Sequence, residues 1–315
     1  MEIKLSELSN GGLIRVVSAS GNLICASAFS PLGIARLIQR TEKKLSDPLI
    51  VSIYSRYDVF RLARDFPEKA YQLTSHFWPG PLNLVLDALN EIPSILNDSS
   101  AHVMITMPEN PEFRDILKVA EVPLVVCPED AKSIARSLPL EVEIPIQDSV
   151  LNNASVLSFS DHQNPTLLFE GSIAIKQMEA IIGPIEHITV SPGEFLARSA
   201  SKISPVTPFF LAGKNTYSVS RKRGQGKVAL VTFGPESKEA AGFAAIKNLS
   251  VSGDVAEAAA NFHSTIKEID SLGLDAVFLE PLPECSLGAQ LNERFRRIGL
   301  DMQAFGNLMN ETCPD

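Results

Sequence analysis

The chain of 315 residues lacks the features of several common protein classes. It has only four cysteines, Cys25, Cys127, Cys285 and Cys313, and no Cys-x-x-Cys pair, which argues against a zinc site and a disulfide framework. We therefore expect all four to be small buried apolar residues. The chain has no run of about 18 apolar residues that could span a bilayer, and no signal peptide pattern at its start. These absences favour a cytoplasmic protein without a membrane partner.

Excess positive charge is also lacking. The chain has 37 acidic residues against 28 Lys and Arg, which gives a formal net charge of -9. This balance disfavours broad attraction to nucleic acid, because such attraction requires many cations that face phosphates. Hydrophobic residues are plentiful, at 45% of the chain. A chain of this length and composition can form two domains, each with its own core.

Short strands alternate with helices over the first part of the chain. The expected strands are 12–17, 48–54, 82–86, 103–107 and 123–127, and the expected helical segments are 31–39, 59–63, 68–74 and 111–119. This alternation predicts an α/β fold with a twisted mixed sheet covered by helices.

The periodicity ends at residue 199 and returns near residue 227. The segment between them is rich in Ser, Pro, Gly and Lys, which is typical of a linker. Strands are then expected at 227–233 and 276–279, and helices at 254–272 and 288–298. We therefore predict a first domain at 1–198, a linker at 199–227 and a smaller Rossmann-like α/β domain at 228–315.

The run 75–86, SHFWPGPLNLVL, holds the only Trp of the chain, a stiff Pro-Gly-Pro turn and a strand. It resembles the SFWPGPLTLVL signature of the YrdC-like threonylcarbamoyl-AMP synthases. Residues 11–49 follow the family pattern without a gap, and the run 282–297 is similar to its C-terminal LPxxGLGxAxxxRLxxA motif. The chain is thus identified as a member of this family, of the two-domain type with a C-terminal extension.

The resemblance implies an ATP-dependent nucleotidyltransferase that acts with Mg²⁺ and joins threonine, bicarbonate and ATP, in the pathway that forms threonylcarbamoyladenosine in tRNA. It also suggests tRNA or double-stranded RNA as partners, and it leaves the catalytic residues unassigned. Carried over position by position, the residues on the substrate side are Ser20, Ser52, Thr106 and Ser155. Those on the nucleotide side are Lys43, Asp47, Pro128, Asp130 and Arg136.

A further family motif, SPGMKYRHYAP, forms a linker that closes over the pocket. The segment 204–212 resembles it best, and Ser191-Pro192-Gly193 is a rival placement.

Several cations of the family pattern are replaced. Thr41 stands in place of a lysine, and Thr106 and Phe169 stand in place of arginines. A hydrogen bond to a charged group contributes about 1.5–3 kcal/mol, so these losses together could remove about 5 kcal/mol of substrate binding. Two functions therefore stay open: a diverged active synthase, and a catalytically silent paralogue that binds a nucleotide, double-stranded RNA or a protein. A third, weaker alternative is a ligase with another substrate, which would rely on Lys43 and Arg136.

Overall fold

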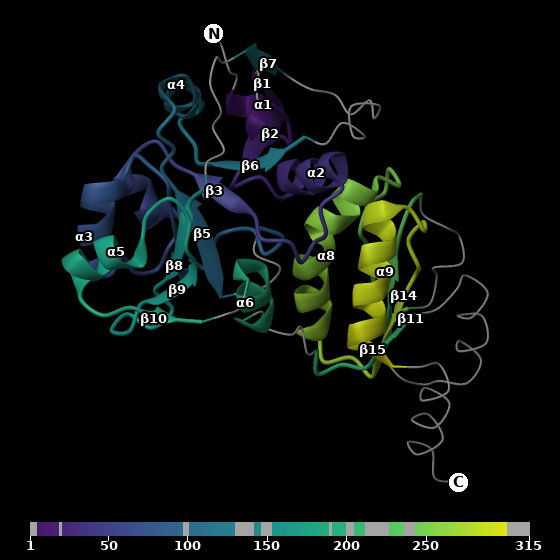
Figure 1. Ribbon diagram of the computed structural model, residues 1–315. Coiled ribbons are helices and arrows are strands. Elements are labelled where there is room, and N and C mark those ends of the chain that lie inside the picture. Colours follow the sequence, from purple (N-terminus) through teal and green to yellow (C-terminus); the bar gives the residue numbers. More distant parts are fainter. Residues whose placement is uncertain are drawn as a thin grey trace. The chain divides into compact units, whose positions relative to one another are not determined.

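The computed structural model describes residues 5–18, 21–96, 101–129, 142–145, 153–188, 191–199, 205–211, 227–235 and 243–300 (Figure 1). The chain divides into two compact units, Met1–Ser201 and Lys202–Asp315. Each unit has its own sheet. Among the described residues, no helix combines the length and the apolar character that a membrane span requires.

The first unit is built on a ten-stranded sheet. Its strands are β1 (Ile14–Ser18), β2 (Gly21–Ser27), β3 (Ile50–Ser52), β4 (Leu82–Asp87), β5 (His102–Thr106), β6 (Leu124–Pro128), β7 (Val142–Pro145), β8 (Ser155–Ser158), β9 (Thr166–Phe169) and β10 (Glu186–His187). Their order across the sheet is β10-β9-β8-β4-β5-β3-β6-β2-β1-β7. The helical segments of this unit are α1 (Leu5–Ser9), α2 (Pro31–Thr41), η1 (Arg56–Arg61, a 3-10 helix), α3 (Glu68–Phe77), α4 (Pro111–Ala120), α5 (Ile175–Ile182) and α6 (Pro192–Ser199).

The sheet is mixed, as predicted. Strand β3 runs parallel to β5 and antiparallel to β6, and β4 runs antiparallel to β5 and parallel to β8. Two helices begin where the sequence signals it. The side chains of Ser30 and Asn110 accept hydrogen bonds from the N–H groups of Gly33 and Phe113, and each cap is followed by a proline.

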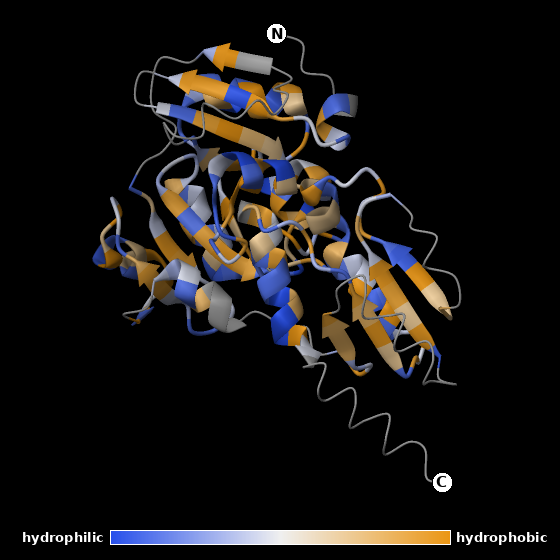
Figure 2. Ribbon diagram, turned by 90° about the vertical axis from the view of Figure 1, so that its right-hand side faces the viewer, coloured by the Kyte–Doolittle hydropathy of each residue, from blue (hydrophilic) through white to orange (hydrophobic). Residues whose placement is uncertain are grey.

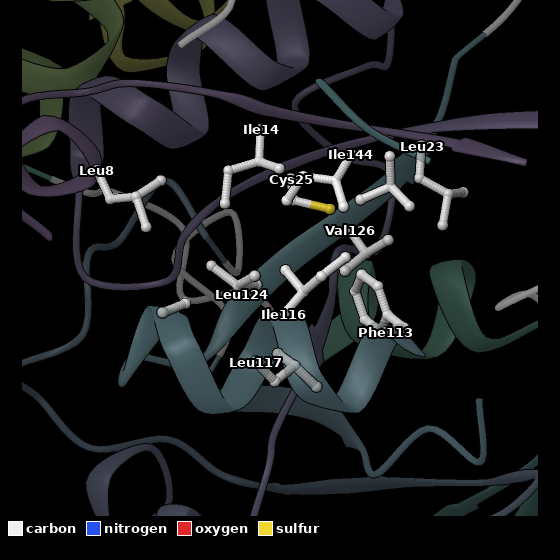
Figure 3. Close-up of a cluster of buried hydrophobic side chains, with 12 residues drawn as sticks. Leu8, Ile14, Leu23, Cys25, Phe113, Ile116, Leu117, Leu124, Val126 and Ile144 are labelled. Atoms are coloured by element: carbon white, nitrogen blue, oxygen red, sulfur yellow. The ribbon is translucent and has the colours of Figure 1, made fainter. Parts of the chain in front are cut away.

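Helix α4 covers one end of a sheet face (Figure 3). Phe113, Ile116 and Leu117 of this helix form a buried cluster with side chains of β1, β2, β6 and β7. The strand residues of the cluster are Ile14, Val16, Leu23, Cys25, Leu124, Val126 and Ile144. This cluster fixes α4 against the sheet.

Helix α6 packs on the same face, near the strands in the middle of the sheet. Its Phe195 lies against a buried cluster that includes Met104, with Ile50 beside it. Ile50 and Met104 are paired across β3 and β5, two positions before Ser52 and Thr106 on the same strands, and side chains two positions apart share a face.

The second unit has a five-stranded sheet in the order β13-β12-β14-β11-β15. The elements are β11 (Phe209–Leu211), β12 (Val228–Thr232), β13 (Ala245–Asn248), α8 (Val255–Asp270), β14 (Ala276–Leu279), α9 (Ser286–Ile298) and β15 (Gly299–Leu300). The pairings are all parallel among the described residues. The strands are largely hydrophobic, as Figure 2 shows, which is typical of parallel sheets buried on both faces.

Strand β11 lies inside the range 199–227, for which the sequence predicts only a linker. It pairs with both β14 and β15. Because β11 is short and has prolines nearby, the sequence shows no strand pattern there.

In α9, a Cβ atom at Gly288 would collide with the carbonyl oxygen of Pro283, which explains why a glycine follows Leu287 in the motif of residues 282–297.

Helix α4 ends at Glu121 in the left-handed conformation, with φ of 53°. A glycine adopts this conformation without the steric penalty of a Cβ atom. We expect Glu121→Gly to raise the free energy of unfolding by about 0.5–1 kcal/mol. Urea unfolding measures the change, and Glu121→Ala is the matched control because it keeps the Cβ atom. Equal stability of the two variants would contradict the prediction.

Candidate functional site

Three polar side chains lie in a row across the middle of the first sheet. Ser52 in β3 is paired with Thr106 in β5, and Thr106 is paired with Asn83 in β4. Paired residues share a face and lie about 5 Å apart. Ser52 and Asn83 are buried, and Thr106 is partly exposed. The fold thus brings together two residues predicted on the substrate side and adds Asn83, which our sequence analysis missed.

This polar row has hydrogen-bonding capacity left for a ligand. Thr106 Oγ1 donates to the carbonyl oxygen of Leu82 at 3.3 Å, and the same oxygen accepts a bond from Trp78 Nε1 at 2.7 Å. A hydroxyl that donates one hydrogen bond can still accept others, so the partly exposed Thr106 keeps acceptor capacity for a ligand. Three polar side chains on one face of neighbouring strands suit a small polar ligand.

Ser155, the third predicted residue on the substrate side, is paired with Leu82, the residue before Asn83. Its hydroxyl donates to the carbonyl oxygen of Ile173 at 2.8 Å and accepts bonds from the N–H groups of Gly171 and Ile173. Ser155 is fully buried. Its strand therefore adjoins the polar row, while its hydroxyl holds the turn that follows β9.

The described residues predicted on the nucleotide side lie toward the opposite ends of the same strands. Lys43 and Asp47 precede β3, and Pro128 ends the antiparallel strand β6. Burial raises the pKa of the Cys127 thiol to about 12, with smaller electrostatic effects of Lys43 and Asp47, so both charges lie near this end of β6. Asp47 also accepts a hydrogen bond from the N–H of Lys44 at 2.9 Å.

The remaining predicted residues, Ser20, Asp130 and Arg136, lie outside the described residues, so their predicted roles stay predictions.

A buried ion cluster lies directly after β6. The Glu129 side chain is fully buried and accepts hydrogen bonds from Arg40 Nη2 at 2.8 Å and Arg15 Nε at 2.7 Å. Asn22 Nδ2 donates to the same carboxylate at 3.3 Å. Burial opposes ionisation of Glu129, but the bonds from Arg40 and Arg15 outweigh it and lower the pKa of this carboxyl.

This ion cluster affects how much positive charge is left for a ligand near the predicted nucleotide loop. In the family pattern PLAAPSANxSG, Glu129 falls on an alanine. The chain has arginines close to the predicted nucleotide loop, but Arg40 and Arg15 both donate to Glu129, whose single negative charge offsets half of their combined charge. Sequence reasoning missed the cluster because its members are 89 and 114 positions apart.

Helix α6 clarifies the placement of the pocket-closing motif. Gly193 lies against Pro48, since a Cβ atom there would be 3.2 Å from Pro48 Cδ. Phe195 covers the face that carries the polar row. The segment 204–212, which the sequence favours, contains β11 of the second sheet instead. The fold thus agrees better with Ser191-Pro192-Gly193.

The cysteine prediction is wrong at one position. Cys25 and Cys127 are buried as expected, and burial raises the pKa of both thiols. Cys285 is exposed, because it occupies the N-cap position of α9, where the chain enters the helix from a surface loop. Cys313 lies outside the described residues.

Comparisons with known proteins agree with this architecture. Residues 6–134 match the family model of Sua5, YciO and YrdC, which is described as "Telomere recombination". The matched residues lie within the first unit. The resemblance predicted from the sequence is therefore confirmed.

Relatives extend the likeness beyond the YrdC domain. Threonylcarbamoyl-AMP synthase from Pyrococcus abyssi is 22% identical over 295 residues, which cover 86% of each chain. The synthase from Bacillus subtilis is 23% identical over 306 residues, which cover 86% of this chain and 85% of the relative. The human synthase is 30% identical over 141 residues, which cover 44% of this chain and 48% of the relative.

A solved structure shows the same fold. The crystal structure of Pyrococcus abyssi Sua5 complexed with L-threonine matches with a TM-score of 0.50 at 21% identity, and the match covers 93% of this chain and 92% of that one. The YrdC domain and the C-terminal unit therefore form a two-domain Sua5 fold, which confirms the predicted fold class.

Proposed function

We propose that this chain is a diverged threonylcarbamoyl-AMP synthase that serves the formation of threonylcarbamoyladenosine in tRNA. The observation that carries the proposal is the polar row Ser52–Thr106–Asn83, which has free hydrogen-bonding capacity in a domain whose relatives are named for this activity.

The proposed reaction has two bond-forming steps. The amine of threonine attacks the carbon of bicarbonate, which forms a carbamate and releases water. A carbamate oxygen then attacks the α-phosphorus of ATP, and the bond to the β-phosphate oxygen breaks to release pyrophosphate. The site must therefore hold a carboxylate and a polyphosphate together, which requires positive charge.

Residues at different ends of the strands would bind the phosphates and the amino acid. Lys43, near the end of β6, would face the phosphates as a point charge. Ser52 and Asn83 would hold polar groups of the amino acid. Among the described residues, no three His, Cys, Asp or Glu side chains converge as metal ligands, so Mg²⁺ would enter with the phosphates of ATP.

A second candidate function is a catalytically silent paralogue that uses the same surface to bind a nucleotide, double-stranded RNA or a protein. One observation favours it: the carboxylate of Glu129 occupies donors of Arg40 and Arg15 beside the predicted nucleotide loop and offsets part of their charge. A carboxylate there also repels phosphate.

Pyrophosphate release from ATP by the purified chain separates the two functions. We expect release that requires both threonine and bicarbonate, at a rate up to about a thousandfold below that of the Bacillus subtilis relative, because several cations are replaced. Omission of threonine is the control, and the relative run in parallel shows that the assay works. Release that does not depend on threonine would reject the synthase. Calorimetry with ATP and with duplex RNA would then test the silent paralogue.

A further inference from the structure

Arg114 lies one turn into α4, at the sheet edge that holds the polar row. Strands β3 and β5 are parallel and end at Ser52 and Thr106, so the chain leaves the sheet at the same edge after each of these residues. The chain continues from Thr106 through a short loop to Asn110, which caps α4 with its side chain. The N–H of Arg114 donates to the carbonyl oxygen of Asn110 at 3.0 Å.

The guanidinium of Arg114 is held at this edge by an aromatic ring. Its Cζ atom lies 5.3 Å from the ring centroid of Tyr54, within the usual distance of a cation–π contact. Tyr54 follows Ser52 by two positions. The N–H of Ile53, between them, donates to the carbonyl oxygen of Thr106 at 3.0 Å. The Arg114 head group is thereby tied to the strand ends that carry Ser52 and Thr106.

Arg114 also has a donor with no acceptor. Its Nη1 atom is buried, and no hydrogen-bond partner for it exists among the described residues. This contrasts with Arg40 and Arg15, which both donate to the carboxylate of Glu129. A guanidinium donor shielded from water and left unpaired is unfavourable, so the free protein holds Arg114 in a state that an anion would relieve.

We propose that Arg114 binds the carboxylate of the amino-acid substrate, in place of the arginine that the family pattern has at Thr106. The proposal rests on the proposed function, because it assigns a residue to the same site. A guanidinium suits a carboxylate because its planar fork can donate two parallel hydrogen bonds. A carboxylate is favoured over a phosphate because Lys43, Asp47 and Pro128 lie toward the opposite ends of these strands.

Calorimetry with L-threonine and with L-threonine amide, which lacks the carboxylate charge, tests the assignment. The wild-type chain should bind L-threonine more tightly than the amide. Arg114→Met should weaken L-threonine binding roughly tenfold to a hundredfold and leave amide binding nearly unchanged. Arg114→Lys should fall between them, since lysine keeps the charge without the fork. Equal binding of L-threonine by wild type and Arg114→Met, or no binding by wild type, would overturn the proposal.

Two further variants exclude a general effect of lost charge or lost folding. Lys118→Met removes the same charge from an exposed position of α4 and should leave L-threonine binding unchanged. Thr106→Arg in the Arg114→Met background should regain at least tenfold in affinity, because it returns the cation to the position of the family pattern. Melting temperatures of all variants show whether they fold, and if the Arg114→Met chain fails to fold, Arg114→Lys decides: unchanged L-threonine binding by this variant would overturn the proposal.

Pyrophosphate release by the same variants distinguishes a failure of this proposal from a failure of the proposed function. If L-threonine binding depends on Arg114 but no pyrophosphate appears, the result supports carboxylate binding by Arg114 and rejects the synthase function. If Arg114→Met releases pyrophosphate with an unchanged KM for threonine, the synthase stands and the carboxylate site is overturned.

Discussion

Replacing Glu129 with alanine is expected to lower the free energy of unfolding by about 3–5 kcal/mol, because it breaks a buried ion cluster from one side only. The side chain of Arg40 is 4% exposed and that of Arg15 is 17% exposed. Without the carboxylate, both guanidinium groups lose their counter-charge where water cannot replace it. Urea unfolding followed by circular dichroism measures the change.

Two variants sharpen this experiment. Glu109 is an exposed carboxylate of the same unit, and Glu109→Ala should change stability by no more than about 0.5 kcal/mol. Adding Arg40→Met to Glu129→Ala should recover part of the loss, because an apolar side chain needs no counter-charge. A Glu129→Ala chain as stable as Glu109→Ala would show that the cluster contributes nothing.

The same cluster makes the free energy of unfolding depend on pH in a direction that can be predicted. Because the arginines lower the pKa of Glu129 below its unfolded value, the carboxylate stabilises the fold above the unfolded pKa, about 4.3 for glutamate. That contribution is lost as the pH falls through the lower folded pKa. The stability difference between wild type and Glu129→Ala should thus be constant from about pH 6 to 8 and shrink below about pH 4.

Phe113→Ala is expected to lower the free energy of unfolding by about 3–5 kcal/mol, since it removes most of a fully buried ring from a packed core. Figure 3 shows Phe113 among the apolar side chains that α4 presses against β6 and β2. Urea unfolding again supplies the measurement.

The loss of stability at position 113 should depend on how much side-chain volume is removed. Phe113→Leu keeps most of the volume and should cost less than about 1.5 kcal/mol. Tyr57→Ala removes a ring that is 83% exposed and should have little effect. If Phe113→Ala were no worse than Tyr57→Ala, α4 would not be anchored by this cluster.

Local signals in the sequence were enough to predict the well-capped helices. The Ser30-Pro31 and Asn110-Pro111 pairs mark the starts of α2 and α4, because cap and proline act within one turn. The strands β8, β9 and β11 were missed, since each has only three or four residues and no clear alternation.

The candidate site was only partly predictable, because its geometry depends on strand register. Ser52 and Thr106 were identified by resemblance, but their direct pairing, and the presence of Asn83 beside them, depend on contacts between distant segments. The replaced cations were visible in the sequence. The ion pair of Arg40 with Glu129 and the unpaired Nη1 of Arg114 were not, since burial and partners are properties of the fold.

The packing of α6 determines how the first unit can be produced by itself. Phe195 shields an apolar patch formed by Val85, Met104, Val156 and Leu168. A truncated protein that stops at residue 188 would expose this patch to solvent and should aggregate on purification. A fragment that extends through Ser201 retains its own cover, so it is the shortest piece we would express for ligand screening.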